Sequence, residues 1–520
     1  MKPAQFIELT AYEGHIPSEL SADYILPDTY PDVKKILRVC AKPVLIGRYI
    51  SGKRLEFSGA VDYKVLFSAD TENGESIHAV HFAGEWSGSL PDIESIDTAS
   101  VCVIPTVSAC TVRLANPRKL TIKSTVSTYA RISVPCPVAP SIEGTHTAAE
   151  EASLERLGHT VTARRERTFL ADVLRISENL EPDASQPAID EIISCGAQIY
   201  LGEAKINAND LTVALKGAAN VNCIYKPQGE AGVYRSFSRR LPIAYIVDAS
   251  EYTDVFAACR AETLCARALA TTVEINAEVG ENSYGERRML ELDVSADVNV
   301  SIVGGEDVPV VLDAYSLTRE TECITREYTA RAPGKMLCAS FSVGESLGRS
   351  ELAIPENAKV IDTEIEIVSP GISVERGRLL LTASAVTSSI IEADGSFSGI
   401  SATIPIKCEL SAGEVSEPLY FAADLTASDV RVRLDNERIY FDFEVSLCAE
   451  ICERSRNVAV SAVRFTGECK RTPVGATLTL CYPTESDTLW QIAKRYKTTV
   501  AAIEAANADV SGVLLIPSAI

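Results

Sequence analysis

Strict alternation of apolar and polar residues marks short segments along most of the chain. Residues 120–126 (LTIKSTV) are the first clear case, and the alternation returns at 290–294 and 439–445. Because successive side chains of a strand point to opposite faces of a sheet, this alternation predicts half-buried β-strands. Turn-forming residues at 115–118 (ANPR) and 435–437 (DNE) precede two of these segments and predict β-hairpins.

The hairpins recur at intervals of about 160 residues. The strand at 111–114 (TVRL) returns at 272–275 (TVEI) and 431–434 (RVRL), each time ahead of one alternating segment. This period is too long for a solenoid unit, so each copy is predicted to be a domain. The sequence therefore predicts a mostly β chain with three tandem antiparallel β-sandwich-like domains, at residues 1–140, 169–330 and 331–471.

Two stretches differ from this pattern. The Ala, Glu and Arg content of residues 141–168 predicts a partly helical linker between the first two copies. Residues 472–520 predict a small βααβ domain, in which Asp487 or Thr488 caps the first helix. The apolar face of that helix has the spacing i, i+3, i+4 and i+7: Leu489, Ile492, Ala493 and Tyr496.

A motif runs through this C-terminal segment. Residues 486–496 follow the pattern S-D-T-L-W-x-I-A-x-x-Y, and Asn507 and L-I-P at 515–517 come after it. The pattern resembles the LysM module, which binds N-acetylglucosamine-containing glycans in a groove between two loops. The resemblance implies a groove formed by Ser486, Asp487, Thr488, Leu489, Asn507, Ala508, Asp509 and Val510. Ser486 stands where the family has glycine, and the second loop is a few residues shorter than usual.

Trp490 lies beside the buried face of the same helix. Tryptophan is enriched at interface hot spots, so Trp490 is a candidate anchor for a partner. The alternative is that Trp490 covers the edge of a domain too small to bury it.

The repeats carry a second resemblance. The Pro-Asp element at 27–31, its recurrence at 182–187 and the motif at 312–316 (LDAYS) resemble the SPOCS domain (DUF3794). Tandem SPOCS domains before a C-terminal LysM module resemble the SipL-type family of clostridial spore-coat morphogenetic proteins. The resemblance implies a sporulation protein made in the mother-cell cytoplasm and recruited to the forespore surface. There it would act as a non-enzymatic scaffold for spore coat assembly.

Two classes of partner follow from these resemblances. As a scaffold, the protein would dock through its LysM module to a SpoIVA-type coat-basement ATPase and would contact other coat proteins. In the alternative, the LysM module binds peptidoglycan or a chitin-like glycan, and the protein is associated with the cell wall or cortex.

Composition excludes several other classes. Asp plus Glu total 71 against 49 Lys plus Arg, a formal charge of −22, which disfavours nucleic acid and anionic membrane surfaces. Glu8 and Glu13 interrupt any signal peptide, and no apolar run is long enough to insert into a membrane. The 15 cysteines include no C-x-x-C and are expected to be reduced structural thiols, with later oxidation in an outer shell left open.

Catalytic chemistry is not expected. Residues 344–348 (GESLG) match the G-x-S-x-G elbow, but all five histidines precede Ser346, whereas that chemistry needs a histidine after the serine. This segment is predicted to be a turn. His78 and His81 would point to opposite faces of a strand, so no metal site is predicted. No phosphate-binding loop motif occurs, and no cofactor is expected.

Overall fold

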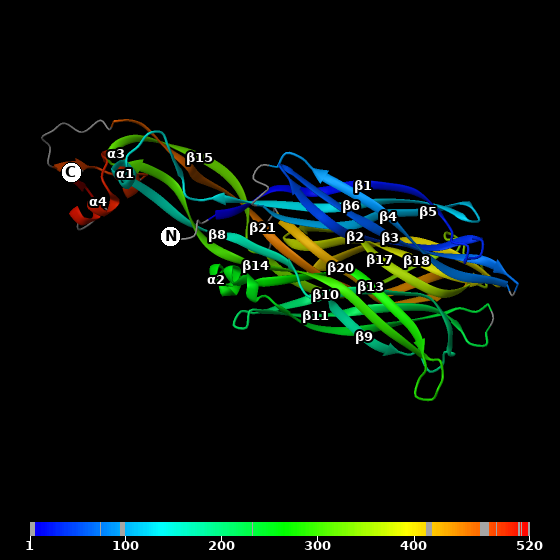
Figure 1. Cartoon of the computed structure of the whole chain (residues 1–520). Coiled ribbons are helices and arrows are strands. Elements are labelled where there is room, and N and C mark those ends of the chain that lie inside the picture. Colours follow the sequence, from blue (N-terminus) through cyan, green and yellow to red (C-terminus); the bar gives the residue numbers. More distant parts are fainter. Residues whose placement is uncertain are drawn as a thin grey trace.

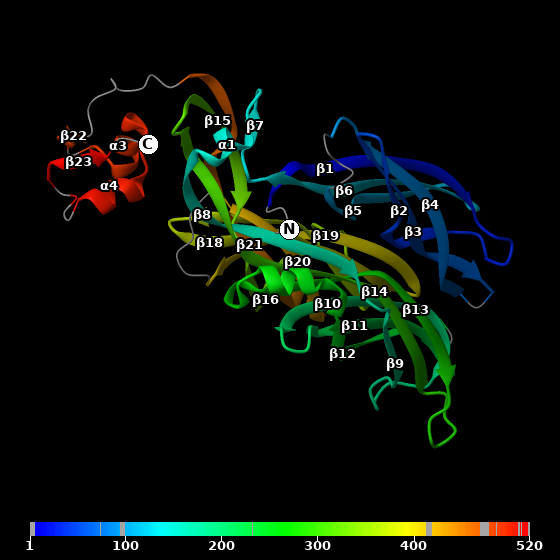
Figure 2. The same cartoon turned by 60° about the vertical axis from the view of Figure 1, so that its left-hand side comes forward.

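The computed structural model describes residues 6–72, 74–93, 99–230, 232–411, 419–468, 478–484, 486–507, 510 and 512–517. Antiparallel strands form an elongated body, and a small unit with two helices lies at one end (Figures 1 and 2). The predicted fold class, mostly β with a C-terminal βααβ unit, is confirmed. No helix among these residues is long and apolar enough to cross a membrane.

Copy one consists of two three-stranded sheets with the orders β1-β6-β5 and β2-β3-β4. The strands are β1 Phe6–Ile25, β2 Lys35–Ser51, β3 Arg54–Thr71, β4 Gly74–Leu90, β5 Ser100–Asn116 and β6 Lys119–Pro137. Side chains from both sheets share one core, in which Leu120, Ile122 and Val126 are buried. The alternation at 120–126 thus directs every second side chain inward, as predicted.

Copies two and three repeat this plan. Copy two has sheets β10-β11-β12 and β13-β14-β8, with β9 also paired to β14, and copy three has β17-β18-β19 and β16-β21-β20. The strands of copy two are β8 Leu154–Leu170, β9 Leu174–Leu180, β10 Ile189–Asn207, β11 Thr212–Pro227, β12 Arg235–Asp248, β13 Cys265–Gly280 and β14 Met289–Ser316. Those of copy three are β16 Lys335–Gly348, β17 Lys359–Glu375, β18 Arg378–Ala393, β19 Ser396–Leu410, β20 Leu419–Leu434 and β21 Arg438–Glu468. Helix α2 (Thr253–Ala258) packs near β8 and β14.

Strands β14 and β21 continue beyond their copies and form an arm. The outer half of β14 pairs with β8, and the outer half of β21 pairs with β15 (Arg319–Arg331) and, in parallel, with β7 (Ser141–Glu143). The two ribbons pack through a small apolar cluster: Leu154, Ala314, Val460, Val463 and Phe465. The arm leads to the small helical unit (Figure 1).

Residues 141–168, where the sequence predicts a partly helical linker, hold three elements. They are β7, helix α1 (Ala148–Ala152) and most of β8. Thr147 and Glu150 form a capping box at the start of α1. The arginine-rich part after residue 154 is a strand, because its pairing with β14 outweighs local helix propensity.

The β2-β3-β4, β10-β11-β12 and β17-β18-β19 sheets form a closed ring. Strand β4 contacts β10, β12 contacts β17, and β19 contacts β2, so each sheet touches the other two. Apolar side chains from all three copies form one cluster between them: Leu37, Leu66, Ile77, Ile224, Tyr234, Ile390 and Phe397. The three copies therefore share a core.

Each sheet of the ring has a β-bulge at the equivalent point of its first strand. The bulged residues join the central cluster: Leu37, Ile193 and Ile361. The next positions hold unlike residues: Arg38, Ser194 and Asp362. Arg38 Nη1 lies 2.5 Å from Asp362 Oδ2, and both side chains are 3% exposed. Asn222 of copy two donates to the other oxygen of Asp362 at 2.9 Å, so the ion pair joins all three copies.

A second buried charge network lies where the arm leaves the body. Glu166 of β8 lies 2.6 Å from Arg131 of β6 and 3.1 Å from Arg164, which also pairs with Glu450 of β21. Burial alone would raise the pKa of Glu166, but Arg164 and Arg131 lower it to about 2. These pairs also join all three copies.

Candidate functional site

The C-terminal unit is built from two short strands and two helices. Strands β22 (Leu478–Cys481) and β23 (Leu514–Pro517) pair antiparallel, and helices α3 (Leu489–Tyr496) and α4 (Val500–Ala506) lie between them in sequence. Its core consists of Cys481, Ile492, Ala493, Ile503, Leu514 and Ile516. Thr488 caps α3 in a capping box with Gln491, so the predicted cap is Thr488 and not Asp487.

The loop before α3 holds the first group of predicted site residues. Ser486 and Thr488 are exposed, while Asp487 and Leu489 are half-buried. Asp487 Oδ2 accepts from the backbone N–H of Thr484 at 3.1 Å, and Oδ1 pairs with Arg495 at 2.7 Å. The hydrogen bonds from Thr484, together with Arg495, lower the pKa of Asp487. Asp487 thus fixes the loop, and its neighbours Ser486 and Thr488 are exposed on either side of it.

The loop after α4 holds the second group. The side-chain amide of Asn507 donates to the carbonyls of Ile503 at 2.7 Å and Leu515 at 2.8 Å, and its oxygen accepts from Leu515 N–H at 2.7 Å. Asn507 therefore joins α4 to β23. Val510 is 43% exposed. Ala508 and Asp509 lie outside the described residues.

Trp490 faces the arm. Its indole N–H donates to Asp313 Oδ2 at 2.9 Å, and its ring makes an edge contact with Tyr315 at 4.8 Å between centroids. Lys494 pairs with Asp313 at 2.6 Å. Although burial opposes this shift, hydrogen bonds from Lys494 and Trp490 lower the pKa of Asp313. The side chain predicted as a candidate partner anchor thus has a partner within its own chain.

Tyr315 is the centre of this contact. It is fully buried, and its hydroxyl donates to the carbonyl of Thr498 at 2.6 Å. Together with Leu317 it belongs to the same apolar cluster as the core of the C-terminal unit. The unit is therefore packed on the end of β14 as well as connected to it by the chain.

Residues 484–516 match the LysM domain family. No curated protein and no solved structure matches the chain. The βααβ order agrees with the order predicted from the sequence. This LysM domain is the part of the chain for which a family is shown.

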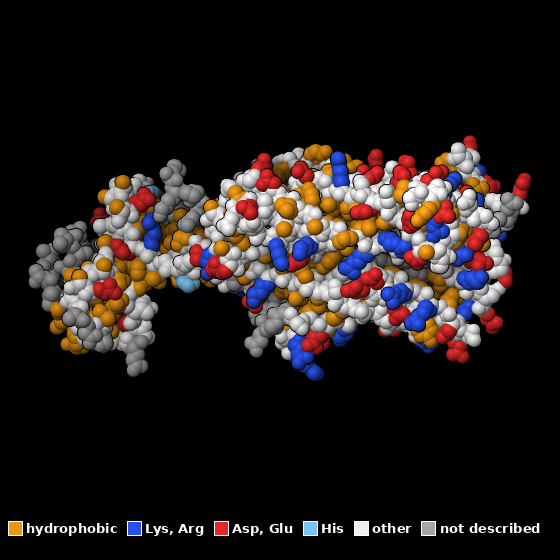
Figure 3. Space-filling model, turned by 90° about the horizontal axis from the view of Figure 1, so that it is seen from below, with side chains coloured by type: hydrophobic (Ala, Val, Ile, Leu, Met, Phe, Trp, Pro, Cys, Tyr) orange, Lys and Arg blue, Asp and Glu red, His pale blue; other side chains and the backbone are white. Residues whose placement is uncertain are grey.

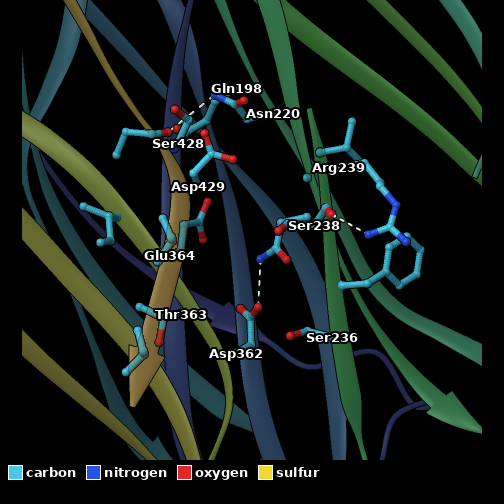
Figure 4. A pocket seen from close by; sticks show the side chains of 18 of the residues that line it. Gln198, Asn220, Ser236, Ser238, Arg239, Asp362, Thr363, Glu364, Ser428 and Asp429 are labelled. Atoms are coloured by element: carbon cyan, nitrogen blue, oxygen red, sulfur yellow. Dashed lines mark hydrogen bonds between the residues drawn. The ribbon is translucent and has the colours of Figure 1, made fainter. Parts of the chain in front are cut away.

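A concave feature lies between copies two and three. A polar pocket of about 390 Å³ is lined by residues of β10, β11, β12, β17 and β20, including Asn220, Arg239 and Asp429 (Figure 4). Asp362 is one of the lining residues, and its carboxylate is held by Asn222 and Arg38. The Asp362 carboxylate therefore takes part in the ion pair that joins the three sheets of the ring.

The motif at 344–348 is a strand, and its prediction as a turn is wrong. These residues end β16 and pair with β21 through residues 438–442. Ser346 Oγ accepts from Arg438 Nε at 2.9 Å. The pairing with β21 decides the conformation, and no strand-to-helix elbow is formed there. Within the described residues, no cluster of His, Cys, Asp or Glu could hold a metal ion.

Sequence reasoning missed the role of Asp313 and Tyr315. Both lie in the LDAYS motif at 312–316, which in the sequence indicates a family resemblance and no contact. One sequence pattern indicates a contact here. Trp490, one of two tryptophans in the chain, lies four residues before Lys494, so the two side chains share one face of the helix. Such a pair indicates a contact but does not identify the acidic residue that completes it.

Proposed function

We propose that this protein is a non-enzymatic binding protein whose LysM domain holds an N-acetylglucosamine-containing glycan such as peptidoglycan. The observation that carries the proposal is the division of the LysM surface. One side, with Trp490 and Lys494, packs on the arm, while Ser486, Thr488 and Val510 of the two loops remain exposed. These three side chains are thus accessible to a ligand while the domain is held in place.

The chemistry of these loops suits an acetylated amino sugar. Thr488 Oγ1 accepts from Gln491 N–H in the helix cap, and its hydroxyl hydrogen can donate to a sugar hydroxyl or acetamido group. The hydroxyl of Ser486, which is 3.1 Å from Thr484 Oγ1, has further hydrogen-bonding capacity for the same groups. Leu489 and Val510 offer apolar surface for the C–H face of the ring and the acetyl methyl group. The body of three copies, with its shared core, would carry the domain and present it on the arm.

Exchanging Val510 for glutamate should weaken binding to insoluble peptidoglycan about tenfold, since a charge would enter the apolar part of the loop pair. Co-sedimentation of the full-length chain measures this. Ile246→Glu is the matched control, because Ile246 is an exposed aliphatic residue of β12, 70% exposed. Equal sedimentation of both variants, or no sedimentation of the parent chain, would contradict the proposal.

A second candidate function is the spore-coat scaffold, in which the LysM domain docks a SpoIVA-type ATPase at the forespore surface. The observation that favours it is a set of exposed apolar residues on the C-terminal unit: Leu480, Tyr482 and Val513. Hydrophobic side chains are visible on this small domain in Figure 3. Exposed aromatic and aliphatic residues of this kind are typical of protein interfaces.

The two candidates predict different outcomes for one variant. Tyr482→Ser should weaken capture of the full-length chain by the immobilised ATPase and leave sedimentation with peptidoglycan unchanged, if the scaffold function is correct. Tyr482 is 73% exposed, so the substitution removes no core contact. Capture that is absent in the parent chain, or unaffected by Tyr482→Ser, would count against the scaffold.

A further inference from the structure

Two cysteines stand opposite each other on neighbouring strands of copy three. Cys338 of β16 is the direct register partner of Cys448 of β21. Their sulfur atoms are 3.4 Å apart and share a hydrogen bond. Both sulfurs also lie 3.0 Å from the carbonyl oxygen of Gly202 in β10, so the pair lies at the contact between copies two and three.

This placement meets the backbone requirement of a disulfide. Directly opposed residues of an antiparallel pair have Cα atoms about 4.5–5.5 Å apart. Disulfides span Cα separations of about 4.4–6.8 Å. The sulfurs can therefore approach bonding distance by side-chain rotation, with the strands unmoved.

The two thiols differ in accessibility and acidity. Cys338 is exposed, whereas Cys448 is buried between β16 and β20, where Asp424 is its register partner. The hydrogen bond shared with Cys448 lowers the pKa of the Cys338 thiol to about 7. The same hydrogen bond and burial raise the pKa of Cys448. An exposed thiolate beside a buried thiol is the arrangement of an attacking and a resolving cysteine.

We propose that Cys338 and Cys448 are a modification site that hydrogen peroxide converts to a reversible cross-strand disulfide. The Cys338 thiolate attacks one peroxide oxygen, the O–O bond breaks, and the released hydroxide takes a proton to become water. Cys448 then attacks the sulfenic sulfur, and its proton leaves with the hydroxyl group as a second water. Two thiols are oxidised by two electrons, and one peroxide is reduced to two waters.

The disulfide would change how copy three is held together. It would close a chain loop from 338 to 448, which contains β17, β18, β19 and β20. Closing a loop of this length restricts the unfolded chain and should raise the melting temperature by about 5 °C. Reduction with dithiothreitol should reverse the rise.

A second cross-strand pair provides an internal comparison. Cys195 of β10 and Cys223 of β11 are also register partners, but both are less accessible than Cys338. Cys195 is half-buried, and Cys223 is fully buried in the core of copy two. Because neither of these thiols is exposed, peroxide should oxidise this pair about tenfold more slowly than Cys338 and Cys448.

The test is peptide mapping of the full-length chain after exposure to hydrogen peroxide and alkylation of the remaining thiols. Trypsin releases residues 336–349 with Cys338 and 439–454 with Cys448. The expected product is these two peptides joined, lighter by two hydrogens than their sum, and separated by reductant. A link between Cys448 and Cys452 instead, or oxidised thiols with no joined peptides, would overturn the proposal.

Two variants complete the experiment. Cys338→Ser should abolish both the joined peptides and the rise in melting temperature, while its melting temperature under reducing conditions matches that of the reduced parent chain. Cys408→Ser removes a thiol of β19 whose register partner is Leu381, and should leave the cross-link intact. Loss of the cross-link in Cys408→Ser would also overturn the assignment.

Discussion

Replacing Asp362 with alanine is expected to lower the free energy of unfolding by about 3 kcal/mol, because the buried Arg38 would lose Asp362 and keep the longer contact with Glu364, at 3.6 Å. The side chains of Arg38 and Asp362 are both 3% exposed, and the second nitrogen of Arg38 donates to the carbonyl of Ser388 at 2.7 Å. Asn222 would lose its acceptor in the same step. The midpoint of urea unfolding of the full-length chain measures the loss.

Two comparisons separate the buried pair from ion pairs in general. In Arg38→Met/Asp362→Leu, apolar side chains of similar size replace both charges, and part of the stability should return, although Asn222 still lacks its acceptor and Glu364 loses Arg38. Asp442→Ala breaks the exposed pair of Asp442 with Arg433 at 3.0 Å and should have little effect. If Asp362→Ala is as mild as Asp442→Ala, the ring does not depend on this ion pair.

The asymmetry of this pair also bears on how the copies are ordered. The positions after the three bulges hold Arg38, Ser194 and Asp362, so only one of the three contacts around the ring can form the ion pair. If two copies exchanged places in the ring, the apolar residues of the central cluster could still pack together. The charges of Arg38 and Asp362 would then no longer face each other. Buried charges thus favour a single arrangement of three similar units.

The strands were predictable from sequence because their signal is local. Alternation at 120–126, 290–294 and 439–445 places every second residue inward, and the structure has strands there. The ring was not predictable, since Arg38 and Asp362 are 324 positions apart and nothing in either segment specifies the other. The strand at 154–168 was missed for a similar reason, because its charged residues are buried by partners from β6 and β21.

The candidate site divides in the same way. Thr488, Asn507 and the apolar face of α3 follow from short-range spacing. In the structure Thr488 caps α3, Asn507 bonds to β23, and the apolar face of α3 lies in the core of the unit. The surface against which Trp490 packs depends on Asp313, which lies 177 positions earlier. Sequence spacing within a small domain predicts which residues cap helices or form its core. It does not predict which surface residues contact the rest of the chain.

Replacing Tyr315 with alanine is expected to release the LysM domain from the arm. Removing a large aromatic side chain from a fully buried position costs about 3–5 kcal/mol, which corresponds to a shift of more than about a hundredfold in the docking equilibrium. The substitution removes both the hydrogen bond from the Tyr315 hydroxyl to the carbonyl of Thr498 and the ring contact with Trp490. The chain has two tryptophans, so Trp86→Phe leaves Trp490 as the only indole reporter.

In the Trp86→Phe background, Tyr315→Ala should shift the emission of Trp490 to longer wavelength and increase its quenching by acrylamide, because the indole would become exposed to water. Tyr284→Ala is the matched control, since Tyr284 is 86% exposed on a loop of copy two. Unchanged quenching in Tyr315→Ala would mean that the domain is not docked in solution. If the released domain still sediments with peptidoglycan, and Val510→Glu weakens that binding, then the docking surface and the ligand surface are separate faces of one small domain.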